Sequence, residues 1–138
     1  MSHTTLKGSC LCGAVKYVAS GEAKRFYHCH CSRCRKATGT GHATNLFIQP
    51  GTLEWLSGKE LVREYKVPEA QRFANNFCTT CGSRVPRESP SMGFVFIPAG
   101  SLDDEPPIGP QARIFTGSRA QWSCTDGELP AHEGYPPP

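Results

Sequence analysis

The sequence lacks several features that mark whole classes of protein. It has no run of about 18 apolar residues, so we expect no membrane span. Its first ten residues, MSHTTLKGSC, lack the apolar region of a secretory signal, so we expect a cytoplasmic protein. No segment of about 20 residues or more repeats, so we expect no repeat architecture.

A strong charge bias is also missing. The 138 residues carry a formal net charge of +3, which is only weakly basic. No basic stripe interleaved with aromatic residues occurs, so we expect no nucleic-acid partner. Nothing in the composition specifies an oligomeric state. With 38% hydrophobic and 20% charged residues, the chain has the composition of an ordinary globular protein.

Turn-forming residues are abundant, with 14 glycines and 12 prolines, and they favour short strands over long helices. We predict one β-dominated domain over residues 1–133, built of several small antiparallel sheets, followed by a Pro-rich tail at 134–138. The expected strands lie within residues 13–20, 43–50, 61–67, 93–100 and 112–118. One helical turn, SRCRKAT at 32–38, is expected to start at the N-cap Ser32, and Trp55 and Trp122 are expected in the core.

Cysteines are the most informative residues in the sequence. Seven of the eight fall into three short motifs, SCLCG, CHCSRC and FCTTCGS, and Cys124 stands alone. In a chain for which no secretory signal is expected, such clusters indicate metal ligands or catalytic groups before disulfides. A thioredoxin-like redox pair would need a βαβ context, which the expected strands do not provide.

The first and third motifs together offer the four thiolates that a closed structural zinc site requires. Residues i and i+2 of an extended segment point to the same side, so Cys10 and Cys12 can face one ion. Cys78 and Cys81 form a C-x-x-C turn, a frequent zinc motif. We therefore predict a four-cysteine zinc site that staples two parts of the β-domain.

The middle motif has three thiols, Cys29, Cys31 and Cys34, and so leaves one coordination position open. Three protein ligands and an open position are typical of a catalytic zinc. Alternatively, His28, His30 or His42 supplies a fourth ligand and closes the site. His30 lies between two ligands of an extended stretch, so we expect it to point away from the metal.

The motifs GSCLCGAV, CHCSRCRKATG, FCTTCGS and PAGSLDD, in this order, resemble those of the glutathione-dependent formaldehyde-activating enzyme family, which includes proteins similar to centromere protein V. The resemblance implies a β-rich fold with two zinc ions. It implies Cys10, Cys12, Cys78 and Cys81 as ligands of the closed site, and Cys29, Cys31 and Cys34 as ligands of the open one. The family's founding enzyme is longer, and His42 stands where members often carry an aromatic residue.

The resemblance also implies a carbon–sulfur lyase that forms S-hydroxymethylglutathione from glutathione and formaldehyde. A thiol entering the open position of a zinc loses its proton and remains nucleophilic, which suits addition to a small aldehyde. Arg35 and Lys36 are candidates for pairing with the carboxylates of glutathione, and His42 for a place in the pocket wall. Two other interpretations are a non-catalytic glutathione binder and a zinc-stapled interaction domain.

Overall fold

The computed structural model describes residues 3–123 and 129–138 and confirms the β-dominated fold class. The elements are β1 (His3–Ser9), β2 (Lys16–Cys29), α1 (Ser32–Thr38), β3 (Ala43–Ser57), η1 (Lys59–Leu61), β4 (Val62–Lys66), β5 (Ala74–Cys78), β6 (Arg84–Val85), β7 (Arg87–Ser89), β8 (Phe94–Pro98), η2 (Ala99–Ser101), β9 (Ala112–Ile114) and η3 (Thr116–Ser118). None of the helices in these described ranges has the length and apolar character needed to cross a membrane.

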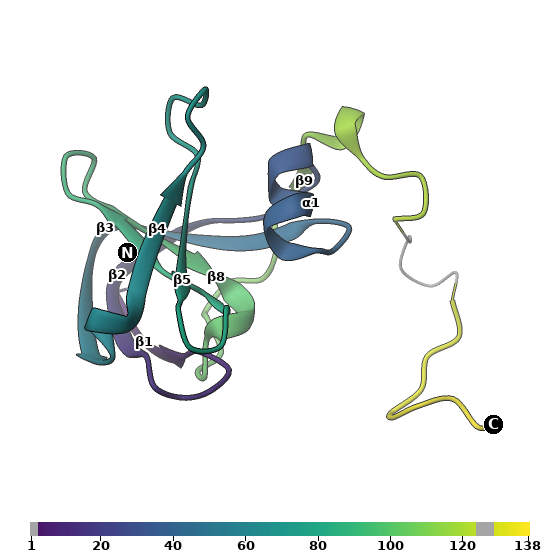
Figure 1. Cartoon of the computed structure of the whole chain (residues 1–138), viewed down its shortest axis with the longest axis horizontal. Helices are drawn as coiled ribbons and strands as arrows, with labels where there is room; N and C mark the ends of the chain where they lie inside the picture. The colour runs from purple at the N-terminus through teal and green to yellow at the C-terminus, as the bar shows by residue number, and fades with distance from the viewer. Residues whose placement is uncertain (1–2, 124–128) are drawn as a thin grey trace.

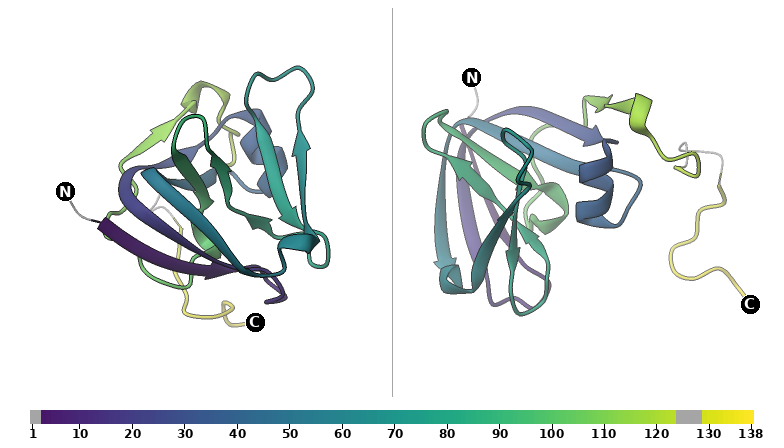
Figure 2. Two further views of the ribbon diagram at one scale, coloured as in Figure 1. Left: turned by 90° about the vertical axis from the view of Figure 1, so that its left-hand side faces the viewer. Right: turned by 45° about the horizontal axis from the view of Figure 1, so that its top comes forward.

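Two sheets make up the fold (Figure 1). The larger has six strands in the order β1-β2-β3-β8-β7, and β9 pairs with β2. The smaller has the order β4-β5-β6, and its β4–β5 hairpin stands to one side of the larger sheet (Figure 2). All pairings are antiparallel except that of β2 with β9. The larger sheet is thus more extensive than the small sheets expected from the sequence.

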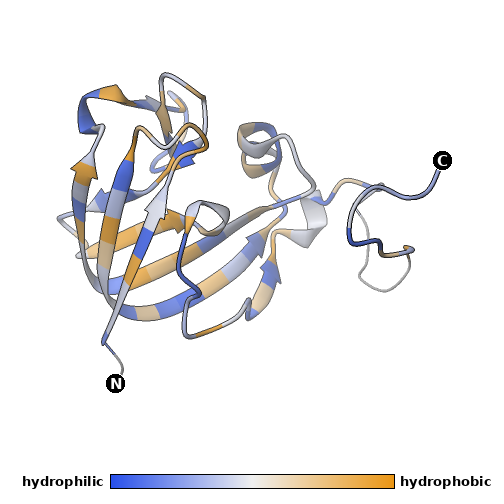
Figure 3. Ribbon diagram, turned by 90° about the horizontal axis from the view of Figure 1, so that it is seen from below, coloured by the Kyte–Doolittle hydropathy of each residue, from blue (hydrophilic) through white to orange (hydrophobic). Residues whose placement is uncertain are grey.

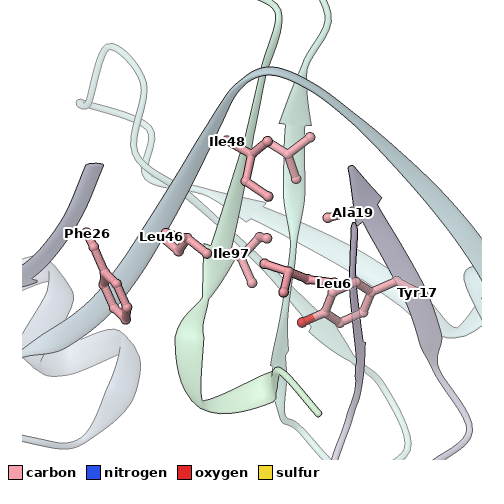
Figure 4. Close-up of a cluster of buried hydrophobic side chains, with 8 residues drawn as sticks. Leu6, Tyr17, Ala19, Phe26, Leu46, Ile48 and Ile97 are labelled. Carbon is pink, nitrogen blue, oxygen red and sulfur yellow. The ribbon is translucent and has the colours of Figure 1, made fainter. Parts of the chain in front are cut away.

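The larger sheet curls because its two longest strands bend together. The register between β2 and β3 shifts on both sides of Ala23, next to the pairing of Gly21 with Gly51. A Cβ on Gly21 would lie 2.0 Å from the carbonyl oxygen of Pro50, so only glycine allows the two strands to approach here. Beyond this point β3 arches over the buried side chains (Figure 4).

The concave face of this curled sheet holds the main core. Hydrophobic and polar residues alternate along the strands (Figure 3), which places one set of side chains on each face. The buried cluster is made of Leu6, Tyr17, Ala19, Phe26, Leu46, Ile48, Val95 and Ile97. The Tyr17 hydroxyl finds a polar partner at the edge of the cluster, 2.6 Å from the hydroxyl of Ser101.

The alternate residues of β2, β3 and β8 face the other way. Tyr27 pairs with Asn45, and Phe47 pairs with Phe96, so these four residues lie together on neighbouring strands. The helix α1 follows directly from β2 and lies beside β9 at one end of the sheet (Figure 1). The chain therefore brings the motif CHCSRC to the end of this second face.

Several local predictions can now be compared with the structure. The helix spans 32–38 as predicted, but its N-cap is Cys31 and not Ser32. The segment 112–118 forms a short strand only to Ile114 and then a 3-10 turn. Trp55 packs against the main core and against a second buried cluster that contains Val15 and Val85. The expectation for Trp122 was wrong, because it is 69% exposed. Cys124 lies outside the described residues.

Candidate metal centres

Four cysteines from distant parts of the chain meet between the two sheets. Cys10 and Cys12 belong to the connection from β1 to β2, and Cys78 and Cys81 flank the turn from β5 to β6. Their sulfur atoms all lie within 4.8 Å of one another. The measured separations of 3.6 Å for Cys10–Cys12 and 4.0 Å for Cys12–Cys78 bracket the roughly 3.8 Å between sulfurs of a tetrahedral zinc with bonds of about 2.3 Å. This group could hold a metal ion, and zinc fits it.

Backbone and hydroxyl groups support these sulfurs. The Val15 amide lies 3.3 Å from Cys10 Sγ. The Ser83 hydroxyl lies 3.4 Å from Cys81 Sγ and also accepts a hydrogen bond of 3.0 Å from the Leu11 amide, so it links the two loops. This hydroxyl is the main reason that the pKa of Cys81 falls to about 5. Hydrogen bonds to a thiolate favour the charged form that metal binding needs.

The middle motif brings a second group of sulfurs together at the start of α1. Cys29 ends β2, Cys31 caps the helix, and Cys34 lies in its first turn. The Cys31 sulfur accepts a hydrogen bond of 3.3 Å from the Cys34 amide, in the manner of an N-cap oxygen. All three sulfurs lie within 4.8 Å of one another, so this group could also hold a metal ion. Among the described residues, no histidine or carboxylate joins the group as a fourth ligand.

The pKa values of the three thiols shift in different directions, so the three sulfurs do not ionise equally. Burial raises the pKa of Cys34 and of Cys29 above the usual range of a thiol. Burial also opposes ionisation of Cys31, but the Cys34 amide and the neighbouring thiols outweigh it and lower the pKa of Cys31. Adjacent sulfurs cannot all carry negative charge unless a cation compensates it, which is the arrangement that a thiolate metal site provides.

A cavity of about 450 Å³ opens beside these three sulfurs. Five aromatic rings from separate parts of the chain contribute to its wall, and two arginines and one buried amide are among its polar groups. The lining residues are Tyr27, Cys29, Cys31, Ser32, Arg33, Cys34, Asn45, Phe47, Phe73, Ala74, Arg87, Phe96, Ile114, Phe115 and Ser118. The three-cysteine group therefore has direct access to a space that can receive a small molecule.

The three histidines near the motif form a stack of their own. His30 is 1% exposed, accepts a hydrogen bond of 3.2 Å at Nε2 from Arg113 Nε, and has its ring 5.1 Å from that of His42. The rings of His28 and His42 are 4.2 Å apart, and the Thr44 hydroxyl contacts Nδ1 of both, at 2.9 Å and 3.2 Å. His42 lines a different cavity of about 600 Å³ together with Thr38 and Thr40. The stack thus lies beside the sulfurs without joining them.

The structure does not bring Arg35 or Lys36 to the cavity beside the three sulfurs. Lys36 lines a separate, smaller cavity of about 280 Å³ together with Tyr65, and the Nε of Arg35 is buried. The arginines that line the cavity are Arg33 and Arg87. From the sequence, Arg35 and Lys36 were the favoured candidates of this basic segment and Arg33 a weaker one.

Two polar residues of this cavity were missed altogether. Asn45 was recognisable in principle, since it is a polar residue beside the core residues Leu46 and Ile48 in an apolar strand. Arg87 carried no signal, because only the pairing of β7 with β8 brings it opposite Phe96.

Comparisons with known proteins show which family and which structures this chain is similar to. Residues 5–118 match the family described as "Glutathione-dependent formaldehyde-activating enzyme". A protein of Halomonas elongata named "Putative glutathione-dependent formaldehyde-activating enzyme" is 34% identical over 125 residues, which are 85% of this chain and 78% of that protein. A crystal structure of a Rhodobacter sphaeroides protein has the same fold, with a TM-score of 0.50 and 24% identity, over 78% of this chain and 99% of that one.

Proposed function

The chain belongs to the glutathione-dependent formaldehyde-activating enzyme family, and on this basis we propose that it is a zinc-dependent enzyme of the carbon–sulfur lyase type. Its substrates are glutathione or a similar small thiol and formaldehyde or a related small aldehyde. The thiol sulfur forms a bond to the carbonyl carbon, and the carbonyl oxygen takes up the proton that the thiol loses, so the product is an S-hydroxyalkyl thiol.

The observation that carries the proposal is the difference between the two cysteine groups. Cys10, Cys12, Cys78 and Cys81 complete a four-sulfur site, which is the composition of a structural zinc. Cys29, Cys31 and Cys34 supply three sulfurs, gain no fourth ligand from the described residues, and line a cavity. A zinc ion with three thiolate ligands and an open position binds a further thiol sulfur and favours its deprotonated form.

The chain's own groups have three tasks in this proposal. The Cys34 amide holds the Cys31 sulfur in place through its 3.3 Å hydrogen bond. The left-handed conformation of Gly39 (φ of 70°) ends α1 right after the sulfurs, so the chain can turn back into β3. The guanidinium groups of Arg33 and Arg87 line the cavity and can pair with a carboxylate of the bound thiol or aldehyde.

Calorimetric titration of reduced glutathione into protein with two zinc ions per chain tests the binding part of the proposal. We expect saturable binding that disappears with S-methylglutathione, whose sulfur has no proton to lose, and with Cys31→Ser. Absence of binding at millimolar glutathione, or equal binding of the methylated compound, would contradict the thiol site.

Turnover separates an enzyme from a non-catalytic thiol binder at the same site. Formation of the glutathione adduct of ¹³C-formaldehyde can be followed by exchange NMR against a protein-free control, because the addition also proceeds spontaneously. We expect an exchange rate that rises in proportion to protein concentration and is lost in Cys31→Ser. Binding without acceleration would assign the protein to thiol binding or transport.

A further inference from the structure

The cavity beside the three-cysteine group has a lining that a one-carbon aldehyde does not require. We propose that this cavity binds the ring of an aromatic aldehyde that carries a carboxylate, and that such a compound is the electrophile of the reaction. The inference rests on the proposed function, since the three-cysteine group then supplies the site for the thiol. Its argument comes from the walls, the buried polar atoms and the charges of the cavity.

Size and wall chemistry favour an aromatic occupant. A volume of about 450 Å³ corresponds to roughly fifteen water-sized molecules, far more than formaldehyde fills. The wall carries the rings of Tyr27, Phe47, Phe73, Phe96 and Phe115. Phe47 and Phe96 meet edge to face, with centroids 5.1 Å apart at 86°. Another ring packs favourably in such surroundings.

One buried acceptor in the wall needs a donor from the ligand. Asn45 is only 4% exposed, and its Oδ1 receives no hydrogen bond from any residue in the described ranges. An unpaired buried acceptor costs about 1–3 kcal/mol, so a ligand hydroxyl that reaches it gains binding energy. The addition product of thiol and aldehyde has such a hydroxyl. It forms as sulfur bonds to the carbonyl carbon, the carbonyl π electrons move to oxygen, and oxygen takes the proton lost by the thiol.

The charges around the cavity favour an anionic group on the ligand. Arg33 and Arg87 line it, and no aspartate or glutamate does so among the described residues. Arg87 Nε is buried and has no hydrogen-bond acceptor within the described part of the chain. The Arg87 guanidinium lies 5.7 Å from the centroid of the Phe96 ring. A carboxylate attached to a bound ring is therefore the complement of this wall.

Phe115 adds an independent sign of a ligand site at the cavity. It adopts a φ of +56°, the left-handed region that a bulky side chain normally avoids, and the residue is 65% exposed although it lines the cavity. Such backbone strain gathers at places where a ligand is held. The strained conformation keeps an aromatic ring at the cavity rim, where it can cover a bound ring.

The probe that matches all three features is 4-(hydroxymethyl)benzoate, which has the ring, the carboxylate and a hydroxyl but no reactive aldehyde. Titration into the zinc-loaded protein, followed by amide chemical shifts, should give saturable binding with shifts at Asn45, Phe96 and Arg87. Benzyl alcohol lacks the carboxylate, 4-methylbenzoate lacks the hydroxyl, and 4-(hydroxymethyl)cyclohexanecarboxylate lacks the aromatic ring. Each should bind about tenfold more weakly or worse.

Matched variants place the binding within the cavity. Phe96→Leu, Asn45→Leu and Arg87→Gln should each weaken the probe by about tenfold or more. Phe94→Leu and Arg25→Gln are the controls, since Phe94 precedes Phe96 on the same strand face and Arg25 stacks on Phe47 at 4.8 Å, yet neither lines the cavity. Unfolding curves of all five variants identify any that has lost its fold.

The same samples separate this inference from the proposed function. One outcome is that glutathione binds but the probe shows no saturable binding up to about 10 mM, which is weaker than specific complexes usually are. This outcome overturns the proposal of an aromatic substrate and leaves the proposed function unaffected. Equal weakening by the control variants also overturns it. Probe binding without glutathione binding supports the cavity assignment and rejects the thiol site. Faster adduct formation from 4-formylbenzoate than from formaldehyde supports both.

Discussion

The sulfur atoms of Cys12 and Cys78 lie 4.0 Å apart although 66 residues separate them in the sequence. This approach joins the β1–β2 connection of the larger sheet to the β5–β6 turn of the smaller one. Few other buried side chains link the same regions, because the local core there consists of Val15, Val85 and two of the cysteines. A metal ion at the four-sulfur group would therefore contribute directly to the free energy of folding.

The two cysteine groups should respond differently to the same substitution. Cys78→Ser removes a fully buried sulfur of the four-sulfur group, and the free energy of unfolding should fall by on the order of 5 kcal/mol or more if zinc binds there. Cys31→Ser retains an N-cap oxygen for α1, so the loss should stay below about 2 kcal/mol while glutathione binding disappears. Chemical denaturation and zinc content measure both effects. Equal destabilisation by the two variants would indicate two structural sites.

Tyr17 should make stability depend on pH under alkaline conditions. Burial is the main reason that the pKa of its hydroxyl rises to about 12, whereas an unfolded tyrosine titrates near 10. The folded state is favoured fully below pH 10, where Tyr17 is protonated in both states. Between pH 10 and pH 12 only the unfolded chain releases the Tyr17 proton readily, so this stabilisation is lost as the pH rises through 12. The free energy of unfolding should fall by about 2–3 kcal/mol across this interval. Tyr17→Phe should lack this component, and an identical pH profile in that variant would contradict the assignment.

Two glycines with similar backbone angles should tolerate alanine very differently. Gly39 has a φ of 70° with no atom within 4 Å of an added Cβ, so Gly39→Ala should cost only the strain of the left-handed region, about 1 kcal/mol. Gly58 has a φ of 77°, and its Cβ would lie 2.2 Å from the carbonyl oxygen of Ala14. Gly58→Ala should cost at least about 2 kcal/mol more. Thermal and urea unfolding provide the comparison, and similar losses would mean that the loop at Gly58 shifts freely.

Leu46 tests the location of the main core. Its side chain is fully buried in the cluster that contains Ile48 and Ile97, so Leu46→Ala should lower the free energy of unfolding by about 2–5 kcal/mol. Leu56 lies on the same strand but is 52% exposed, so it is the matched control. Leu56→Ala should change the free energy of unfolding by less than about 0.5 kcal/mol. A loss of the same size in both variants would place the core elsewhere.

Local patterns predicted only part of the local structure, since the strands β1, β5, β6 and β7 lie outside the expected ranges. The span of the helix at 32–38 and the β-dominated fold class could be read from turn residues and alternation, because these depend on neighbours in the chain. The N-cap residue of this helix was harder to predict from the sequence. Ser32 has the stronger preference for that position, but Cys31 occupies it and its sulfur accepts the Cys34 amide. The prediction that Trp122 lies in the core failed for a related reason, since hydrophobicity alone does not reveal which surface a loop residue will contact.

The sequence by itself determined that one group of four sulfurs and one group of three sulfurs were available as metal ligands. The number and spacing of such ligands depend only on composition and short-range geometry. It also carried the family resemblance that the comparison over residues 5–118 then confirmed. Tertiary structure decided which groups face the three sulfurs. Strand pairing brings Asn45 and Arg87 to the cavity, whereas Arg35 and Lys36 on α1 do not line it. Side-chain neighbours across a curled sheet follow from long-range register, and no short stretch of sequence specifies that register.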